Sequence, residues 1–181
     1  MIDYVTAIGM AFPGVSVSCS GDPTVYANLV SSQQLPTEAE IIESWTGVVR
    51  NQRITELSEL CEQFIMAGFI SEAMGQPYFY DSEIVDQINL IGAYMMTHAG
   101  MAVPYAARNM STGVKEYYVH DGQQMTQVLT DGALWKLFYL NKFHNKRQYL
   151  LSLTYPENSI EDIMAVTWDS VEAIPDGSTI E

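Results

Sequence analysis

Apolar residues recur at three- and four-residue steps between residues 50 and 65, which predicts an amphipathic helix. Glycine accepts the left-handed conformation that follows many helices, so Gly68 is placed to end it. The alternating aromatic run PYFYD, residues 77–81, predicts a strand, and Asp81 or Ser82 is placed to cap a second helix. The apolar positions of the first helix are Ile54, Leu57, Leu60, Cys61, Phe64 and Ile65. The apolar stripe of the second helix consists of Ile84, Val85, Ile88, Ile91 and Met95.

The region before this unit predicts a small module made of a helix and a hairpin. Residues 2–12 have the apolar spacing of a short helix. Residues 15–20 and 24–32 alternate apolar and polar side chains around a Gly-Asp-Pro turn, a pattern typical of a two-stranded hairpin. Thr37 and Glu40 have the spacing of a capping box, so a longer helix should begin there.

The two long helices each contain a point at which the sequence leaves two outcomes open. The Thr46–Gly47 pair allows either a joint or an unbroken first helix. Asp121, with Gln124 at the capping-box position, predicts the start of another helix that continues to about Leu151, unless residues 141–145 bend it. The predicted buried face of this helix consists of Met125, Val128, Leu129, Trp135, Phe138 and Tyr139.

The segment between these helices predicts a loop and then a strand. Residues 98–113 are predicted to be a loop, because Gly100 and Pro104 interrupt them. Residues 114–120 alternate in the manner of a strand, and the aromatic run at residues 77–81 is its expected partner. The two strands together would form a short ribbon lying against the helices.

These elements predict an α+β fold that is mainly α. We expect an irregular helical bundle with a short two-stranded ribbon and a small N-terminal helix-hairpin module. The expected divisions are residues 1–35 for that module, 36–155 for the mainly helical domain and 156–181 for an acidic tail. Within the tail, Ser159 should begin a short helix. Apolar residues there could fix the tail to a core or to another subunit, namely Trp168, Val171 and Ile174.

The net charge of the chain limits the kinds of molecule that it can bind. It has 8 Lys and Arg residues against 22 Asp and Glu residues, a formal net charge of −14. This acidity argues against binding to nucleic acid or to an anionic membrane, since both need a basic surface. Half of the basic residues lie between Lys136 and Arg147. That segment is either a helix face with lysine stems on apolar surface or a docking point for an acidic neighbour.

The sequence contains no set of residues that indicates a catalytic, cofactor-binding or metal-binding site. Cys19 and Cys61 show no zinc-ligand spacing, and Cys61 lies on an apolar helix face as a small core residue. The three histidines are scattered, and no nucleophile elbow, phosphate loop or zinc-protease motif occurs. The N-terminus lacks a basic signal-peptide region, and no apolar stretch is long enough to cross a bilayer. We therefore expect a non-enzymatic protein without cofactor or metal.

An aromatic cluster supplies the interface candidates. If the two short strands pair, their tyrosine and phenylalanine side chains converge. They would then form cover for the helices, a protein interface or, less readily, a sugar platform. Together with the tail tryptophan, the candidates are Tyr78, Phe79, Tyr80, Tyr117, Tyr118 and Trp168.

The order of residues between positions 50 and 155 resembles a domain of unknown function found in short proteins of tailed bacteriophages. Genes for such proteins typically lie beside tail-fibre and baseplate genes. The start of the chain is also similar to the front end of small phage tail proteins, at Ala7–Ile8, Phe12–Pro13 and Pro36 to Ile41. The residues that carry the main resemblance are Cys61, Gly68–Phe69, Ser71, Gly75, Tyr80, Asp86–Gln87 and Asn89–Leu90.

The resemblance implies a structural component of the phage tail, placed at the baseplate or at the tail-fibre attachment. Such a component would be made in the host cytoplasm and retained in the virion. It would act through protein–protein contacts with the tail fibre, baseplate subunits or further copies of itself, without nucleic acid or membrane. The alternative is a tail-fibre assembly chaperone that is not retained in the virion. A cell-wall hydrolase is a weaker third hypothesis, because no acid and base pair can be placed.

Overall fold

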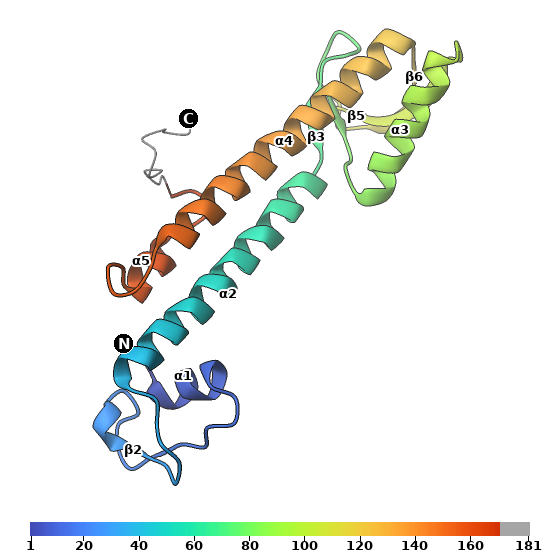
Figure 1. Cartoon of the computed structure of the whole chain (residues 1–181). Coiled ribbons are helices and arrows are strands. Elements are labelled where there is room, and N and C mark those ends of the chain that lie inside the picture. The colour runs from blue at the N-terminus through green and yellow to red at the C-terminus, as the bar shows by residue number, and fades with distance from the viewer. Residues whose placement is uncertain (171–181) are drawn as a thin grey trace. The chain divides into compact units, whose positions relative to one another are not determined.

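The computed structural model describes residues 1–170 of the chain, and Figure 1 shows the order of its elements. The fold is 54% helical and 14% strand, which confirms the predicted mainly α class of mixed helix and sheet. The helices are α1 (Tyr4–Ala11), the 3₁₀ turn η1 (Tyr26–Asn28), α2 (Glu38–Met66), α3 (Ile84–His98), α4 (Gly122–Ser152) and α5 (Ile160–Ala165). The strands are β1 (Ser18–Cys19), β2 (Leu29–Val30), β3 (Phe69–Ser71), β4 (Tyr78–Tyr80), β5 (Val103–Asn109) and β6 (Lys115–His120).

The chain divides into two compact units. Of the described residues, one unit consists of Met1–Leu57 together with residues 145–170, and the other consists of Ser58–His144. The long helices α2 and α4 each contribute residues to both units. The boundaries expected from sequence, after residues 35 and 155, do not coincide with this division, because they follow breaks in pattern along the chain.

The N-terminal module has the helix and hairpin that the sequence predicts. Asp3 caps α1 by accepting hydrogen bonds from the backbone N–H groups of Val5 and Thr6, at 3.0 and 3.2 Å. The hairpin is short, since β1 and β2 pair only through two residues each. Its core includes Tyr4, Ala7, Ile8 and Ile41, all buried. The start of α2 therefore holds α1 in place through Ile41.

Helix α2 begins where its capping box predicts. The Thr37 backbone N–H donates to Glu40 Oε2 at 2.8 Å, and the Glu40 N–H donates back to Thr37 Oγ1 at 3.3 Å. The helix runs unbroken through Gly47 to Met66. Gly68 follows with a φ of +100°, as expected for the residue that ends the helix.

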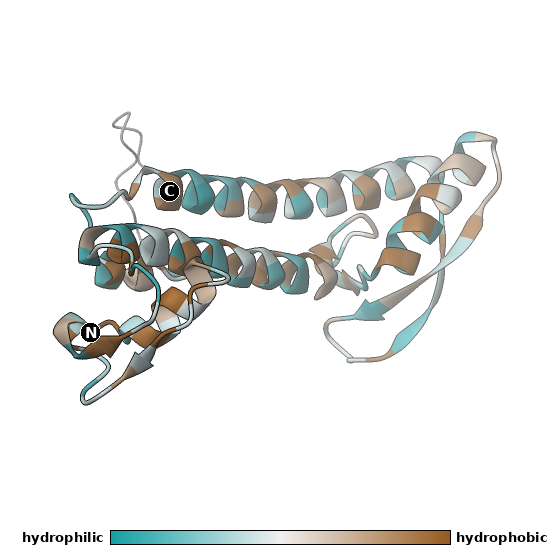
Figure 2. Cartoon of the chain, turned by 60° about the horizontal axis from the view of Figure 1, so that its bottom comes forward, coloured by the Kyte–Doolittle hydropathy of each residue, from teal (hydrophilic) through white to brown (hydrophobic). Residues whose placement is uncertain are grey.

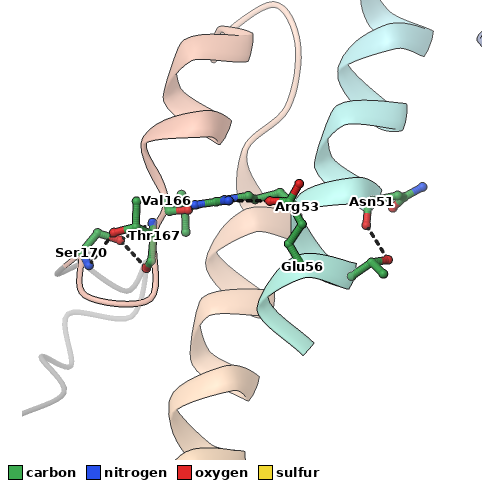
Figure 3. Close-up of polar contacts among 7 residues, drawn as sticks. Asn51, Arg53, Glu56, Val166, Thr167 and Ser170 are labelled. Carbon is green, nitrogen blue, oxygen red and sulfur yellow. Dashed lines mark hydrogen bonds and ion pairs between the residues drawn. The ribbon is translucent and has the colours of Figure 1, made fainter. Parts of the chain in front are cut away.

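Basic side chains of α2 hold the segment around α5. Arg53 Nε donates to the Val166 carbonyl at 2.6 Å, and Figure 3 shows this contact together with the Arg53–Glu56 ion pair. Arg50 donates to the Leu153 carbonyl at 2.9 Å. Lys146 is buried in the same unit and donates to the Ser170 carbonyl at 2.6 Å. Much of the scarce positive charge therefore satisfies backbone carbonyls.

Replacing Arg53 should weaken this unit measurably. Arg53→Met leaves the Val166 carbonyl without its charged donor, and we expect a loss of about 1–3 kcal/mol in the free energy of unfolding. Glu56→Gln is the matched control: its exposed ion pair should contribute less than about 0.5 kcal/mol. Urea unfolding of both variants measures the difference. Equal losses would show that the contact with Val166 contributes nothing to stability.

The second unit contains a four-stranded antiparallel sheet in the order β3-β4-β5-β6. The predicted two-stranded ribbon is therefore wrong. Residues 103–109, within the predicted loop, form β5, and this strand separates β4 from β6. Pro104 is tolerated because β5 pairs with β4 only near its far end, at Asn109 and Arg108. The missing N–H of the proline therefore costs no bond to β4.

Helices α4 and α5 begin where the sequence predicts. The Gln124 N–H donates to Asp121 Oδ1 at 2.8 Å, and Ser159 forms a capping box with Asp162. Helix α4 continues to Ser152 without a break. Its predicted inner face is correct for Met125 and Val128, which are fully buried, and wrong for Phe138, which is 56% exposed.

The two cysteines are free thiols. Cys61 is buried as predicted, and its Sγ donates to the Tyr139 carbonyl at 3.4 Å. Burial raises the pKa of the Cys61 thiol. A buried thiol with a raised pKa is unreactive, so Cys61 is a core residue.

Candidate interaction surface

Helix α3 is held against the sheet by a small inner face. Glu83 forms a capping box with Asp86, so Glu83 caps the helix and not Asp81 or Ser82 as the sequence suggested. Leu90, Ala93 and Thr97 are the buried residues of α3. Figure 1 shows α3 beside β5 and β6, and the Tyr105 hydroxyl of β5 donates to the Asp86 carbonyl at 2.9 Å.

The apolar stripe identified in the sequence lies on the outer side of α3. Its five residues have exposed fractions of 67%, 65%, 64%, 51% and 65% in chain order. Figure 2 shows hydrophobic residues recurring as brown bands along this helix. Five exposed large apolar side chains on one helix mark an interaction surface more often than an ordinary exterior. We call this surface the α3 face; it consists of Ile84, Val85, Ile88, Ile91 and Met95.

A groove of about 740 Å³ extends the α3 face toward the sheet. On the helix side it is lined by Ile88, Gly92 and Met96. On the sheet side its lining includes Pro104 and the outward-facing Tyr117, which is 76% exposed. The lining also contains the polar residues Asp86, Asn89 and Glu116, and an ion pair between Lys115 and Asp81. Apolar residues with polar residues around them are typical of protein interfaces.

The predicted interface residues divide into buried and exposed groups. Tyr78, Tyr80 and Trp168 are buried, with exposed fractions of 6%, 1% and 7%. Phe79 and Tyr118 are half-buried, and Tyr117 alone among the six candidates is well exposed.

The aromatic side chains do converge, although β4 and β6 are not paired. The ring centroids of Tyr78 and Tyr118 lie 4.8 Å apart, in an edge-to-face arrangement. Phe69 stacks on Tyr80 at 5.6 Å. Phe69, Tyr78 and Tyr80 therefore belong to the core of this unit, together with Leu90 and Ala93 of α3.

The basic segment between Lys136 and Arg147 shows internal contacts. Lys136 Nζ donates to Gln87 Oε1 at 3.1 Å, and Lys146 is buried. These contacts favour a role within the chain over a docking patch.

A buried histidine ends strand β6. His120 is fully buried, with Nδ1 2.7 Å from the Tyr118 carbonyl and Nε2 2.9 Å from the Tyr80 hydroxyl. A carbonyl oxygen only accepts, so Nδ1 carries the proton and the Tyr80 hydroxyl donates to Nε2. Burial lowers the pKa of His120 and raises the pKa of Tyr80. The pair is a neutral structural contact, in which both groups keep their uncharged forms.

The burial of His120 makes the free energy of unfolding depend on pH in a defined window. The folded-state pKa of His120 lies below its ordinary value, so the unfolded chain binds more protons as pH falls below about 6.5. The free energy of unfolding should then fall by up to about 1.4 kcal/mol per pH unit. Carboxylates with lowered pKa, such as Glu40 and Asp162, lose their contribution only at lower pH.

Unfolding in urea between about pH 7.5 and pH 5.5, roughly 1 unit either side of the ordinary histidine pKa, measures this dependence. His120→Gln should flatten the slope, and His98→Gln should keep it, because His98 is exposed. An unchanged slope in His120→Gln would assign the acid sensitivity to other groups.

Within residues 1–170 no group of three or more His, Cys, Asp or Glu side chains is arranged to hold a metal ion. Among the described helices, none is long and apolar enough to span a membrane. Comparison of the chain with protein-family models, with curated proteins and with solved structures gives no match.

Proposed function

We propose that this chain is a non-enzymatic structural component of a bacteriophage tail, located at the baseplate or at the tail-fibre attachment. The observation that carries the proposal is the α3 face, since five apolar side chains that are 51–67% exposed need a protein partner to cover them. The resemblance of residues 50–155 to a domain of phage tail-associated proteins supports the phage tail as the location. The virion is accordingly the expected location.

The mode of action follows from the same surface. The α3 face and its groove would make apolar contacts with other proteins of the tail, namely the tail fibre, baseplate subunits or further copies of this chain. An apolar patch with few charges is typical of the centre of a protein interface.

Mass spectrometry of gradient-purified phage particles tests this proposal, with the sheath or tube protein as the internal standard. A tail component should be present at a fixed low multiple of the tail symmetry. If the chain is abundant in the infected-cell lysate and missing from particles, the structural role is refuted. The same α3 face would then belong to an assembly chaperone, and loss of the chain should leave the tail fibres misfolded.

A further inference from the structure

We propose that the α3 face pairs with the α3 face of a second copy of this chain, with the two helices antiparallel about a two-fold axis. This inference deepens the proposed function: it rests on the α3 face being a protein interface and does not depend on the tail setting. Its support comes from the spacing, charge and backbone of α3.

The spacing of the α3 face is self-complementary. Ile84, Ile88, Ile91 and Met95 follow one another at steps of four, three and four residues, the spacing by which paired helices meet. This order is the same in both chain directions. In an antiparallel pair, Ile84 therefore lies opposite the partner's Met95, and Ile88 lies opposite the partner's Ile91. An isologous two-fold contact requires this kind of self-matching.

The distribution of charge leaves the α3 face as a region where two copies can meet without repulsion. The chain carries a formal net charge of −14, so two copies repel each other over most of their surfaces. Residues 87–107 contain no Lys, Arg, Asp or Glu, and this is the longest such run in the sequence. A basic partner would need an acidic surface, which the α3 face does not offer.

Gly92 leaves room on the helix surface for a close contact. Among the described residues outside its own turn of helix, none has an atom within 4 Å of the position that a Cβ of Gly92 would occupy. Gly92 follows Ile91 of the α3 face, so a second backbone can approach closely there. Gly47 in α2 has the same open surroundings, so the glycine permits the contact and does not by itself require it.

The size of the surface sets the expected affinity. The α3 face and the groove residues beside it are fewer than the roughly 20–30 residues per side of a standard interface. We therefore expect a dimer with a dissociation constant on the order of 1 μM rather than an obligate one.

Sedimentation velocity of the full chain over a concentration series tests the pairing. The wild type should shift from monomer to dimer, and Ile88→Glu should raise the dissociation constant at least about 100-fold, by placing a charge in the centre of the contact. Leu137→Glu is the matched control. Leu137 is an exposed apolar residue of α4, 51% exposed, and its replacement should leave the dimer intact. Thermal unfolding confirms that both variants are folded.

Disulfide trapping tests the direction of the pair. In a Cys19→Ser background, Ile84→Cys mixed with Met95→Cys should form a mixed disulfide faster than either variant crosslinks with itself. A wild type that stays monomeric, a dimer that survives Ile88→Glu or is lost in Leu137→Glu, or faster self-crosslinking would each overturn the inference. A monomer that is nevertheless found in phage particles would refute the pairing and leave the tail function standing. A dimer that is missing from particles would refute the tail function and leave the pairing standing.

Discussion

The Gly68→Ala variant should lose about 3–5 kcal/mol of unfolding free energy, the range of severe single substitutions. Gly68 has a φ of +100°, which an alanine adopts only with strain. A Cβ at Gly68 would also lie 2.6 Å from the Tyr80 backbone carbonyl and would overlap the Phe79 ring. The ring can turn aside, but the carbonyl belongs to the paired strand β4 and cannot. The turn from α2 into β3 would have to open.

Gly47→Ala is the matched control, since Gly47 lies inside α2 with open space around its Cβ position. This change should stabilise the chain by up to about 1 kcal/mol, because alanine favours the helix. Urea unfolding of both variants, followed by circular dichroism, measures the difference. A loss below about 1 kcal/mol in Gly68→Ala would contradict the tight turn described here.

Two neighbouring residues of α3 should respond in opposite ways to truncation. Leu90→Ala should lose about 2–4 kcal/mol of unfolding free energy, because Leu90 is 7% exposed and packs in the core of the second unit. Ile91→Ala should lose less than about 0.5 kcal/mol, because Ile91 is 51% exposed. The measurement is denaturant unfolding at a chain concentration low enough for the monomer to dominate.

This comparison tests the orientation of α3 directly. The apolar stripe that the sequence displays contains Ile91 and not Leu90, so a helix buried by that stripe would show the reverse order of losses. If Ile91→Ala costs more than Leu90→Ala in the monomer, the α3 face is part of the core. The interaction surface would then not exist in the form described.

The parts of the fold that could be predicted from sequence are those that local chemistry determines. Thr37 with Glu40, Asp121 with Gln124, and Ser159 with Asp162 each place hydrogen-bonding side chains at a helix start within four residues of sequence. Gly68 ends α2 for a similarly local reason. These positions depend on few tertiary contacts, so their sequence signals are sufficient.

Strand β5 could not be predicted in the same way. Gly100 and Pro104 interrupt its segment, and both residues ordinarily mark loops. Pairing with β6 along Val103 to Arg108 overrides that signal. The strand is therefore a product of tertiary pairing, which a local pattern does not contain.

The α3 face could be predicted from the sequence only in part. The stripe on α3 was visible in the sequence, but its exposure was not, because Leu90 and Ala93 supply a second apolar side. Apolar residues on both sides of a helix indicate that one side needs a partner from outside the unit. The six interface candidates were expected to be accessible to a partner. Tyr78 and Tyr80 lie in the core instead, and among the six only Tyr117 is well exposed.

The most direct test of the central claim is the copy number of this chain in purified phage particles that encode the wild type, Ile88→Glu or Leu137→Glu. The two substitutions replace exposed apolar residues of the same unit, one on the α3 face and one outside it. We expect the wild type and Leu137→Glu at the same copy number, and Ile88→Glu to be lost from particles. Equal copy numbers for all three chains, or a wild type missing from particles, would contradict the account.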